Sequence, residues 1–152
     1  MSSVRRQALI EAPVESIWEL VGNPARHPEW WPRVIEVKGQ RFERGDEYAQ
    51  VTKAATGRIE THFVIERRED LREIRLHCMH THAYADWVLT SAQGGTFVDL
   101  EMGMQPGKLT DRVFDATFGS MYFRRWAEQS LDGLRTAVNA EATPGAAPPG
   151  AA

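Results

Sequence analysis

The segment from His77 to His82 holds four side chains that can bind a metal or move a proton: His77, Cys78, His80 and His82. On an extended strand Cys78, His80 and His82 alternate onto one face, and a thiolate with two imidazoles is a zinc-binding set. Three such ligands on one straight strand would span about 13 Å. That span exceeds what zinc bonds of about 2.0–2.3 Å can bridge. We therefore predict no metal site here and interpret the histidines as half-exposed strand residues.

Two residues are candidates for acid–base chemistry. His80 is the first, because an imidazole with a pKa of about 6.5 exchanges protons at neutral pH, and we expect it at the mouth of an internal cavity. Arg124 is the second, because helical spacing puts it on the face of Leu131, where a buried guanidinium needs a carboxylate or a ligand anion. Each residue also has an alternative interpretation. His80 would then be a polar residue that orients a ligand, and the guanidinium of Arg124 would be exposed or paired with a carboxylate.

The composition of the chain excludes several classes of protein. The 152 residues carry 18 lysines and arginines against 21 aspartates and glutamates, and this net charge of −3 does not favour nucleic-acid binding. Cys78 is the single cysteine, so an intramolecular disulfide is excluded. The sequence contains no apolar run of the roughly 18 residues that span a bilayer, and no phosphate loop or dinucleotide fingerprint. We predict a cytoplasmic protein with no integral membrane segment and no cofactor.

Alternating apolar and polar residues predict a sheet of about seven strands. The strands are expected at residues 4–11, 33–40, 46–54, 57–68, 72–80, 83–92 and 96–105. Short turns rich in glycine and aspartate join the last six, which is typical of an antiparallel meander. Alternation puts Phe63 and Ile65 on the buried face of their strand and Glu60 and His62 on the opposite face.

Helices are expected before and after this run of strands. Apolar residues at helical spacing predict a helix over residues 14–21, and a short helix follows at about 24–27. Two prolines around Trp30 and Trp31 predict an ordered loop. Residues 109–139 contain no proline and predict a long C-terminal helix. This α+β layout forms one domain over residues 1–139, and the Ala-, Pro- and Gly-rich residues 140–152 predict a disordered tail.

The long helix presents two different faces. The face of Leu131 carries small or polar residues in its middle: Ala116, Thr117, Ser120 and Ala127. Small residues opposite a curved sheet indicate space between helix and sheet. The opposite face carries Phe118, Tyr122 and Trp126, which pack on the early helices or form a dimer contact. We therefore expect a monomer or a homodimer.

Several short motifs, in this order and spacing, carry a family resemblance. Residues 10–18 read as the end of a strand, an Ala-Pro pair, and a helix that contains an apolar residue next to a tryptophan. The motifs that follow are Asn23-Pro24, residues 28–32, Trp87 and residues 94–96. Together they resemble the START-like superfamily, also called SRPBCC or Bet v 1-like, over residues 4–139. Within it, the chain is most similar to the polyketide cyclase/dehydrase branch. The resemblance implies a helix-grip fold. In this fold a curved antiparallel sheet wraps around the C-terminal helix, and an apolar cavity lies between the sheet and the helix.

The resemblance also implies a site and a function. Trp31, Trp87, Leu100 and Met102 would face the cavity, and alternation agrees for the last two. The full set of expected ligand-binding residues is Trp31, Phe63, Cys78, His80, Trp87, Leu100, Met102, Met104, Thr117, Ser120 and Arg124. Aromatic walls and adaptable methionines suit a hydrophobic partner that is polyketide-, lipid- or sterol-like.

Three functions remain open at this point. The main hypothesis is binding of such a small molecule in the internal cavity. The first alternative is a polyketide aromatase/cyclase, in which His80 or Arg124 would assist enolisation and dehydration of a poly-β-keto chain. The second is a regulatory or interaction protein with a closed cavity, which would use the face of Phe118, Tyr122 and Trp126.

Overall fold

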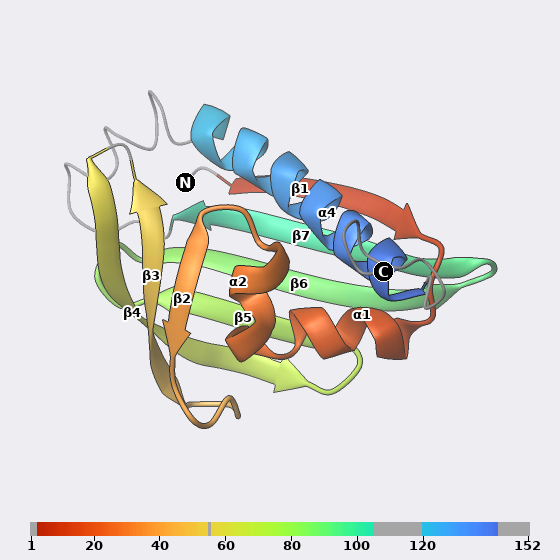
Figure 1. Cartoon of the computed structure of the whole chain (residues 1–152), viewed down its shortest axis with the longest axis horizontal. Coiled ribbons are helices and arrows are strands. Elements are labelled where there is room, and N and C mark those ends of the chain that lie inside the picture. The colour runs from red at the N-terminus through yellow and green to blue at the C-terminus, as the bar shows by residue number, and fades with distance from the viewer. Residues whose placement is uncertain (1–2, 55, 105–119, 143–152) are drawn as a thin grey trace, which may run out of the picture.

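A seven-stranded antiparallel sheet dominates the computed structural model, which describes residues 3–54, 56–104 and 120–142 (Figure 1). The strands are β1 (Ser3–Ile10), β2 (Val34–Lys38), β3 (Glu47–Ala54), β4 (Gly57–Glu69), β5 (Glu73–Cys78), β6 (Ala83–Ala92) and β7 (Gly95–Met104). Their order in the sheet is β1-β7-β6-β5-β4-β3-β2. Strands β2 to β7 therefore form the expected meander, and β1 pairs with β7.

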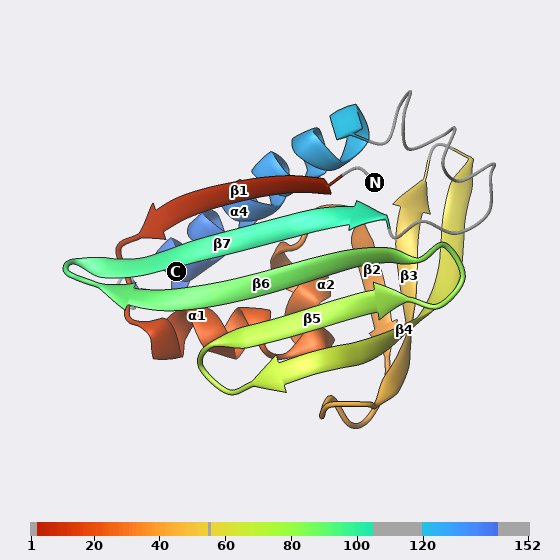
Figure 2. The same cartoon turned by 180° about the vertical axis from the view of Figure 1, so that it is seen from behind.

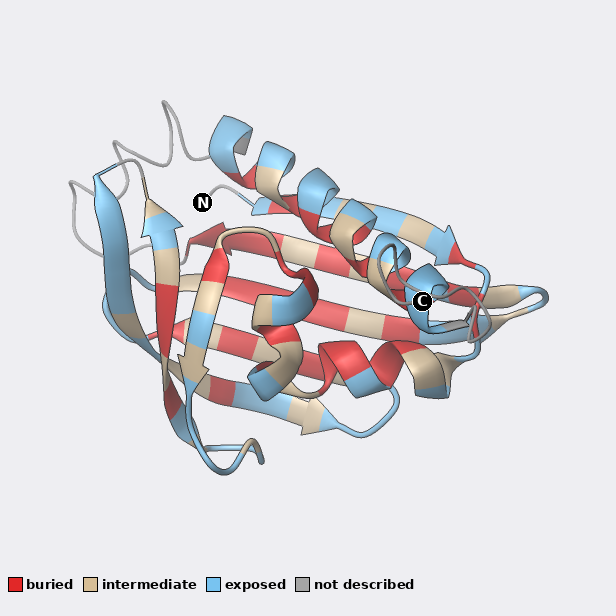
Figure 3. Ribbon diagram, viewed as in Figure 1, coloured by how far each residue is buried: buried red, intermediate tan, exposed pale blue. Residues whose placement is uncertain are grey.

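All of the described helices lie on one face of the sheet, which we call the inner face (Figures 1 and 2). They are α1 (Val14–Val21), the 3-10 helix η1 (Pro24–Arg26), α2 (His27–Trp30) and α4 (Ser120–Ala142). A curved antiparallel sheet with two short helices after its first strand and a long C-terminal helix confirms the predicted α+β, helix-grip fold. The bands of buried residues in Figure 3 mark where the strands and helices meet.

Two helix boundaries differ from the sequence prediction. Residues 27–30 form helix α2 instead of a loop, because Pro28 occupies the first helical turn, where a missing N–H breaks no helical hydrogen bond. Helix α4 includes residues 140–142, which were predicted to belong to the tail. Residues 109–119 of the predicted helix and 143–152 of the predicted tail lie outside the described residues.

The strand register lines up three rows of residues across the inner face. Tyr48 lies opposite Phe63, and Phe63 lies opposite Cys78, so one row crosses β3, β4 and β5. The next row is Leu76, Ala85 and Met102, and the third is Ile74, Trp87 and Leu100. The last two rows are buried beneath the helices and form the core of the domain.

A β-bulge in β4 turns one arginine toward the inner face. The register shifts between Ile65 and Arg67. As a result Arg68 lies on the inner face, whereas simple alternation from Ile65 would place it on the outer face. Its guanidinium donates a hydrogen bond of 2.6 Å to the carbonyl oxygen of Gly22 and lies 5.2 Å from the centre of the Trp18 ring. The bulge thereby ties the C-terminal end of α1 to the sheet.

Helix α4 makes a close approach to the segment that follows α2. A Cβ at Gly133 would lie 2.4 Å from the carbonyl oxygen of Trp30, which is closer than side-chain carbons come to backbone. Two turns earlier, the indole N–H of Trp126 donates a hydrogen bond of 2.9 Å to the carbonyl oxygen of Pro32. Gly133 is therefore required by contact between two backbones and not by its flexibility.

The Gly133→Ala variant is expected to lose up to about 2 kcal/mol of unfolding free energy. A clash with backbone costs about 1–3 kcal/mol, and the higher helix propensity of alanine recovers no more than about 1 kcal/mol of it. Urea unfolding followed by circular dichroism measures the difference. Thr136→Ala, at an exposed position of the same helix, is the control and should change stability by less than about 0.5 kcal/mol. Stabilisation by Gly133→Ala would contradict the close approach.

Candidate functional site

Most of the predicted ligand-binding residues lie on the inner face of the sheet. Six of them are buried there or beside it: Trp31, Cys78, Trp87, Leu100, Met102 and Met104. Phe63 is partly buried and packs against the core. Thr117 and the side chain of Ser120 lie outside the described residues. Ligand contact by this set stays a prediction, and the structure supplies its geometry.

Both candidate acid–base residues are exposed to solvent, which for Arg124 is the alternative that the sequence left open. Strand β5 ends at Cys78, and His80 lies in the following turn, beyond the reach of the alternation that would place it inside. Its ring instead lies 5.7 Å from that of His62, between centroids. The buried face of α4 is centred near Ala127 and Leu134, which leaves Arg124 at its edge and exposed to solvent.

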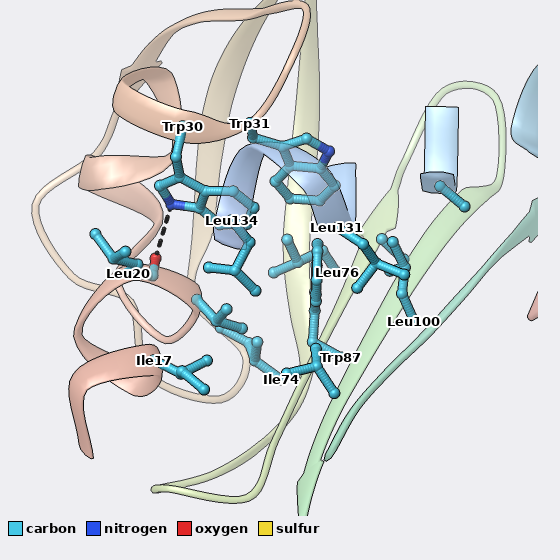
Figure 4. Close-up of a cluster of buried hydrophobic side chains, with 14 of the residues drawn as sticks. Ile17, Leu20, Trp30, Trp31, Ile74, Leu76, Trp87, Leu100, Leu131 and Leu134 are labelled. Carbon is cyan, nitrogen blue, oxygen red and sulfur yellow. Dashed lines mark hydrogen bonds between the residues drawn. The ribbon is translucent and has the colours of Figure 1, made fainter. Parts of the chain in front are cut away.

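Three tryptophans meet at the middle of the inner face (Figure 4). The rings of Trp30 and Trp31 stack at 5.6 Å between centroids, and each makes an edge-on contact with Trp87 at 5.4 Å. Trp30 donates a hydrogen bond to the carbonyl oxygen of Leu20. The indole nitrogens of Trp31 and Trp87 are buried and have no hydrogen-bond partner in the part of the chain that the structure describes. In Figure 4 the nitrogen of Trp31 points away from Trp30.

Strand β3 adds two polar residues that the sequence analysis missed. Tyr48 is 2% exposed, and its ring stacks on Phe63 at 5.7 Å and meets the edge of Phe42 at the same distance. Burial raises the pKa of the Tyr48 phenol well above its ordinary value, and the nearby Cys78 thiol adds to this effect. Gln50 is 3% exposed and donates a hydrogen bond from Nε2 to Thr52 Oγ1 at 3.1 Å. Within the described residues, Tyr48 Oη and Gln50 Oε1 have no hydrogen-bond partner.

Comparison with known proteins identifies the family of the chain. A family model described as "Polyketide cyclase / dehydrase and lipid transport" matches residues 1–139. The chain belongs to this family.

Solved structures with the same fold come from several bacteria. An AHSA1-like protein from Aeromonas hydrophila has 14% identity and a TM-score of 0.72, with 96% of this chain and 98% of that chain covered. Protein NE0264 from Nitrosomonas europaea has 13% identity and a TM-score of 0.75, with 93% and 97% covered. TTHA0849 from Thermus thermophilus has 19% identity and a TM-score of 0.72, with 91% and 98% covered. At these identities the likeness shows the fold alone, and no curated protein matches the chain.

In this member of the polyketide cyclase/dehydrase family, a network of ionisable residues lies on the outer face of the sheet. The carboxylate of Asp86 lies 3.5 Å from the guanidinium groups of both Arg67 and Arg75. Burial and a hydrogen bond with Glu73 raise the pKa of Asp86 above its ordinary value. Since neighbouring Trp87 faces inward, Asp86 faces away from the site and is no partner for an interior base.

The histidine-rich segment is divided between the two faces. Cys78 is buried on the inner face, whereas His82 has a φ of 60° in the turn and lies against His77, with 3.4 Å between Nδ1 and Nε2. The described residues contain no group of three or more histidine, cysteine or acidic side chains that could hold a metal ion. Nor is any described helix of this family member long and apolar enough to cross a membrane.

Proposed function

We propose that this protein binds a hydrophobic small molecule, of the polyketide, lipid or sterol type, against the inner face of its sheet. The observation that carries the proposal is a set of buried polar atoms at a largely apolar face: Trp31 Nε1, Tyr48 Oη, Gln50 Oε1 and Trp87 Nε1. Among the described residues none of these atoms has a hydrogen-bond partner. A buried polar group left unpaired costs about 1–3 kcal/mol, and a ligand that carries oxygen atoms would recover that cost.

The side chains around these atoms suit such a ligand. Phe63 and Cys78 lie side by side at the β3 end of the face, and Met102 and Met104 follow on β7. Aromatic rings give flat, polarizable walls, and methionine adapts to the shape of its neighbour. The description of the family, which includes lipid transport, supports the same class of ligand.

The exposed positions of His80 and Arg124 favour binding over the cyclase alternative. An acid–base group has to lie within hydrogen-bond reach of the proton that it moves. Both residues are exposed, outside the set of interior side chains. The interaction alternative loses support as well, because Trp126 packs against Trp31 and is hydrogen-bonded to Pro32 inside the same molecule.

An NMR titration tests the proposed binding. We expect naphthalene or 1-dodecanol to shift the indole N–H signals of Trp31 and Trp87 saturably, because these groups are buried without a partner within the described residues. The signals of Trp30 and Trp126, which are hydrogen-bonded in the structure, should move less. Native mass spectrometry of the gently purified protein would identify any molecule already bound. The absence of both a retained adduct and a saturable shift with either probe would overturn the proposal.

A pair of matched variants locates the binding face. Phe63→Trp adds bulk to the inner face and should weaken probe binding about tenfold, the equivalent of a steric cost of about 1.4 kcal/mol. Phe97→Trp adds the same bulk on the outer face, where Phe97 is 38% exposed, and should leave the affinity unchanged. Thermal melting verifies that both variants are folded. Equal effects of the two substitutions would place the ligand elsewhere.

A further inference from the structure

We propose that Tyr48 and Gln50 form a recognition point for one uncharged hydroxyl group of the ligand. This inference rests on the proposed function and names the polar group that the bound molecule presents at the β3 end of the inner face. The two residues alternate onto the same face of β3, as residues two apart on a strand do. Their cross-strand neighbours are Phe63 for Tyr48 and Thr61 for Gln50.

The neighbouring side chains hold both polar groups in place. The Tyr48 ring is held between Phe42 and Phe63, with an angle of 16° between the planes of Tyr48 and Phe63. The hydrogen bond from Gln50 Nε2 to Thr52 Oγ1 fixes the amide. Since both side chains are more than nine-tenths buried, neither group can turn to bulk water for the partner that the described residues do not provide.

The unpaired atoms define what the ligand must offer. A tyrosine hydroxyl donates one hydrogen bond, and an amide oxygen only accepts. A ligand hydroxyl both accepts and donates, so it can accept from Tyr48 Oη and donate to Gln50 Oε1. A ketone oxygen only accepts and would leave the oxygen of Gln50 unpaired.

The surroundings also select against a charged group. Burial disfavours the ionised form of an acid, and the raised pKa of the Tyr48 phenol shows this effect at the site itself. The described neighbours that stack on or hydrogen-bond to this pair are two phenylalanines and a threonine, all uncharged: Phe42, Phe63 and Thr52. A carboxylate placed here would lose its hydration without gaining a charged partner. Fatty acids and other anions are therefore disfavoured at this end of the face.

Three naphthalene probes of nearly equal shape test the assignment by calorimetry or NMR. 2-Naphthol should bind the wild-type protein about threefold to tenfold more tightly than naphthalene, the gain expected for a neutral hydrogen bond. 2-Naphthoate should bind at least about tenfold more weakly than 2-naphthol, because its charge is desolvated. Decahydro-2-naphthol, the saturated analogue, distinguishes an aliphatic alcohol from a phenol as the preferred source of the hydroxyl.

Matched tyrosine variants complete the test. Tyr48→Phe and Gln50→Met should each lower the ratio of 2-naphthol to naphthalene affinity toward one, because each removes one of the two hydrogen bonds to the hydroxyl. Tyr84→Phe is the control, because the Tyr84 hydroxyl donates to Glu101 on the outer face, and the ratio should be unchanged. Thermal melting verifies folding.

The possible failures are distinguishable. If no probe binds the wild-type protein, the proposed function is overturned as well. If naphthalene and 2-naphthol bind equally, or if Tyr48→Phe keeps the preference, only the hydroxyl assignment is overturned.

Discussion

Replacing Trp87 with alanine is expected to lower the free energy of unfolding by about 3–5 kcal/mol, the range for removing a large buried aromatic side chain. Trp87 is fully buried, and its ring makes edge-on contacts with Trp30 and Trp31. It also lies in one row with Ile74 and Leu100, so its loss opens a cavity where strands and helices meet. Domains of this kind have about 5–15 kcal/mol in total, so the variant should unfold at a markedly lower urea concentration.

The control for this prediction lies on the neighbouring strand. Phe97→Ala removes an aromatic ring from the outer face of β7, where the side chain is partly exposed, and should cost less than about 1.5 kcal/mol. Urea unfolding of both variants and the wild type, followed by circular dichroism, gives the comparison. Equal losses from Trp87→Ala and Phe97→Ala would mean that the tryptophan cluster is not the core of the domain.

Acidification is expected to cost the protein about 3 kcal/mol of stability through His27 alone. Its ring is fully buried, and the N–H at Nε2 donates a hydrogen bond of 2.9 Å to the carbonyl oxygen of Val21. Its Nδ1 has no hydrogen-bond partner within the described residues, so a second proton there would be buried without an acceptor. Burial therefore lowers the pKa of His27 from 6.5 to about 4.

The sign and the pH range follow from proton binding. Above pH 6.5 the imidazole is neutral in both states, and the contribution of His27 to stability is complete. As the pH falls below that value, the unfolded chain takes up a proton that the folded chain refuses, so stability decreases. The decrease ends near pH 4, where the folded protein binds the proton too. A difference of about 2.5 pKa units is about 3 kcal/mol.

The variant His27→Gln isolates this contribution, because a glutamine amide can still donate to Val21 and does not titrate. Between pH 7 and pH 4 the wild type should lose about 3 kcal/mol of unfolding free energy relative to the variant. The pKa of Asp86 is raised, so its contribution to the stability of the protein has the opposite pH dependence and decreases as the pH rises. Its effect is present in both proteins and cancels in the difference. A pH-independent difference would show that His27 titrates normally.

Local patterns in the sequence predicted most of the fold. Helix α1 and strand β6 begin and end at the predicted residues, because proline, glycine and alternating apolar residues mark their ends. The prediction of a loop in place of helix α2 was wrong. It assumed that two prolines exclude any regular element, although a proline is tolerated in the first turn of a helix. The predicted end of β5 at residue 80 was wrong. The alternating pattern continues through His80, but the chain turns after Cys78.

The candidate site was only partly predictable. Periodicity placed Leu100 and Met102 inside, and the family resemblance pointed to Trp31 and Trp87. The pairing of Tyr48 with Phe63, and of Phe63 with Cys78, depends on strand register, and the β4–β5 register includes a shift between Ile65 and Arg67 that alternation does not reveal. The orientation of Arg124 depends on which side of α4 docks against the segment after α2. Such contacts between distant segments are a tertiary property and leave no local pattern.

The pairing of β1 with β7 has a consequence for how the chain emerges from the ribosome. Strand β1 ends at Ile10, and its only strand partner within the described residues begins at Gly95, so roughly 4–17 s of synthesis separate them at about 5–20 residues per second. An apolar strand without a partner is prone to aggregate. Arg5 and Arg6, whose side chains later pair with Glu101 and Glu128, give the waiting segment two positive charges. We therefore expect the residues that brace the finished edge of the sheet also to keep the first strand from aggregating until its partner is made.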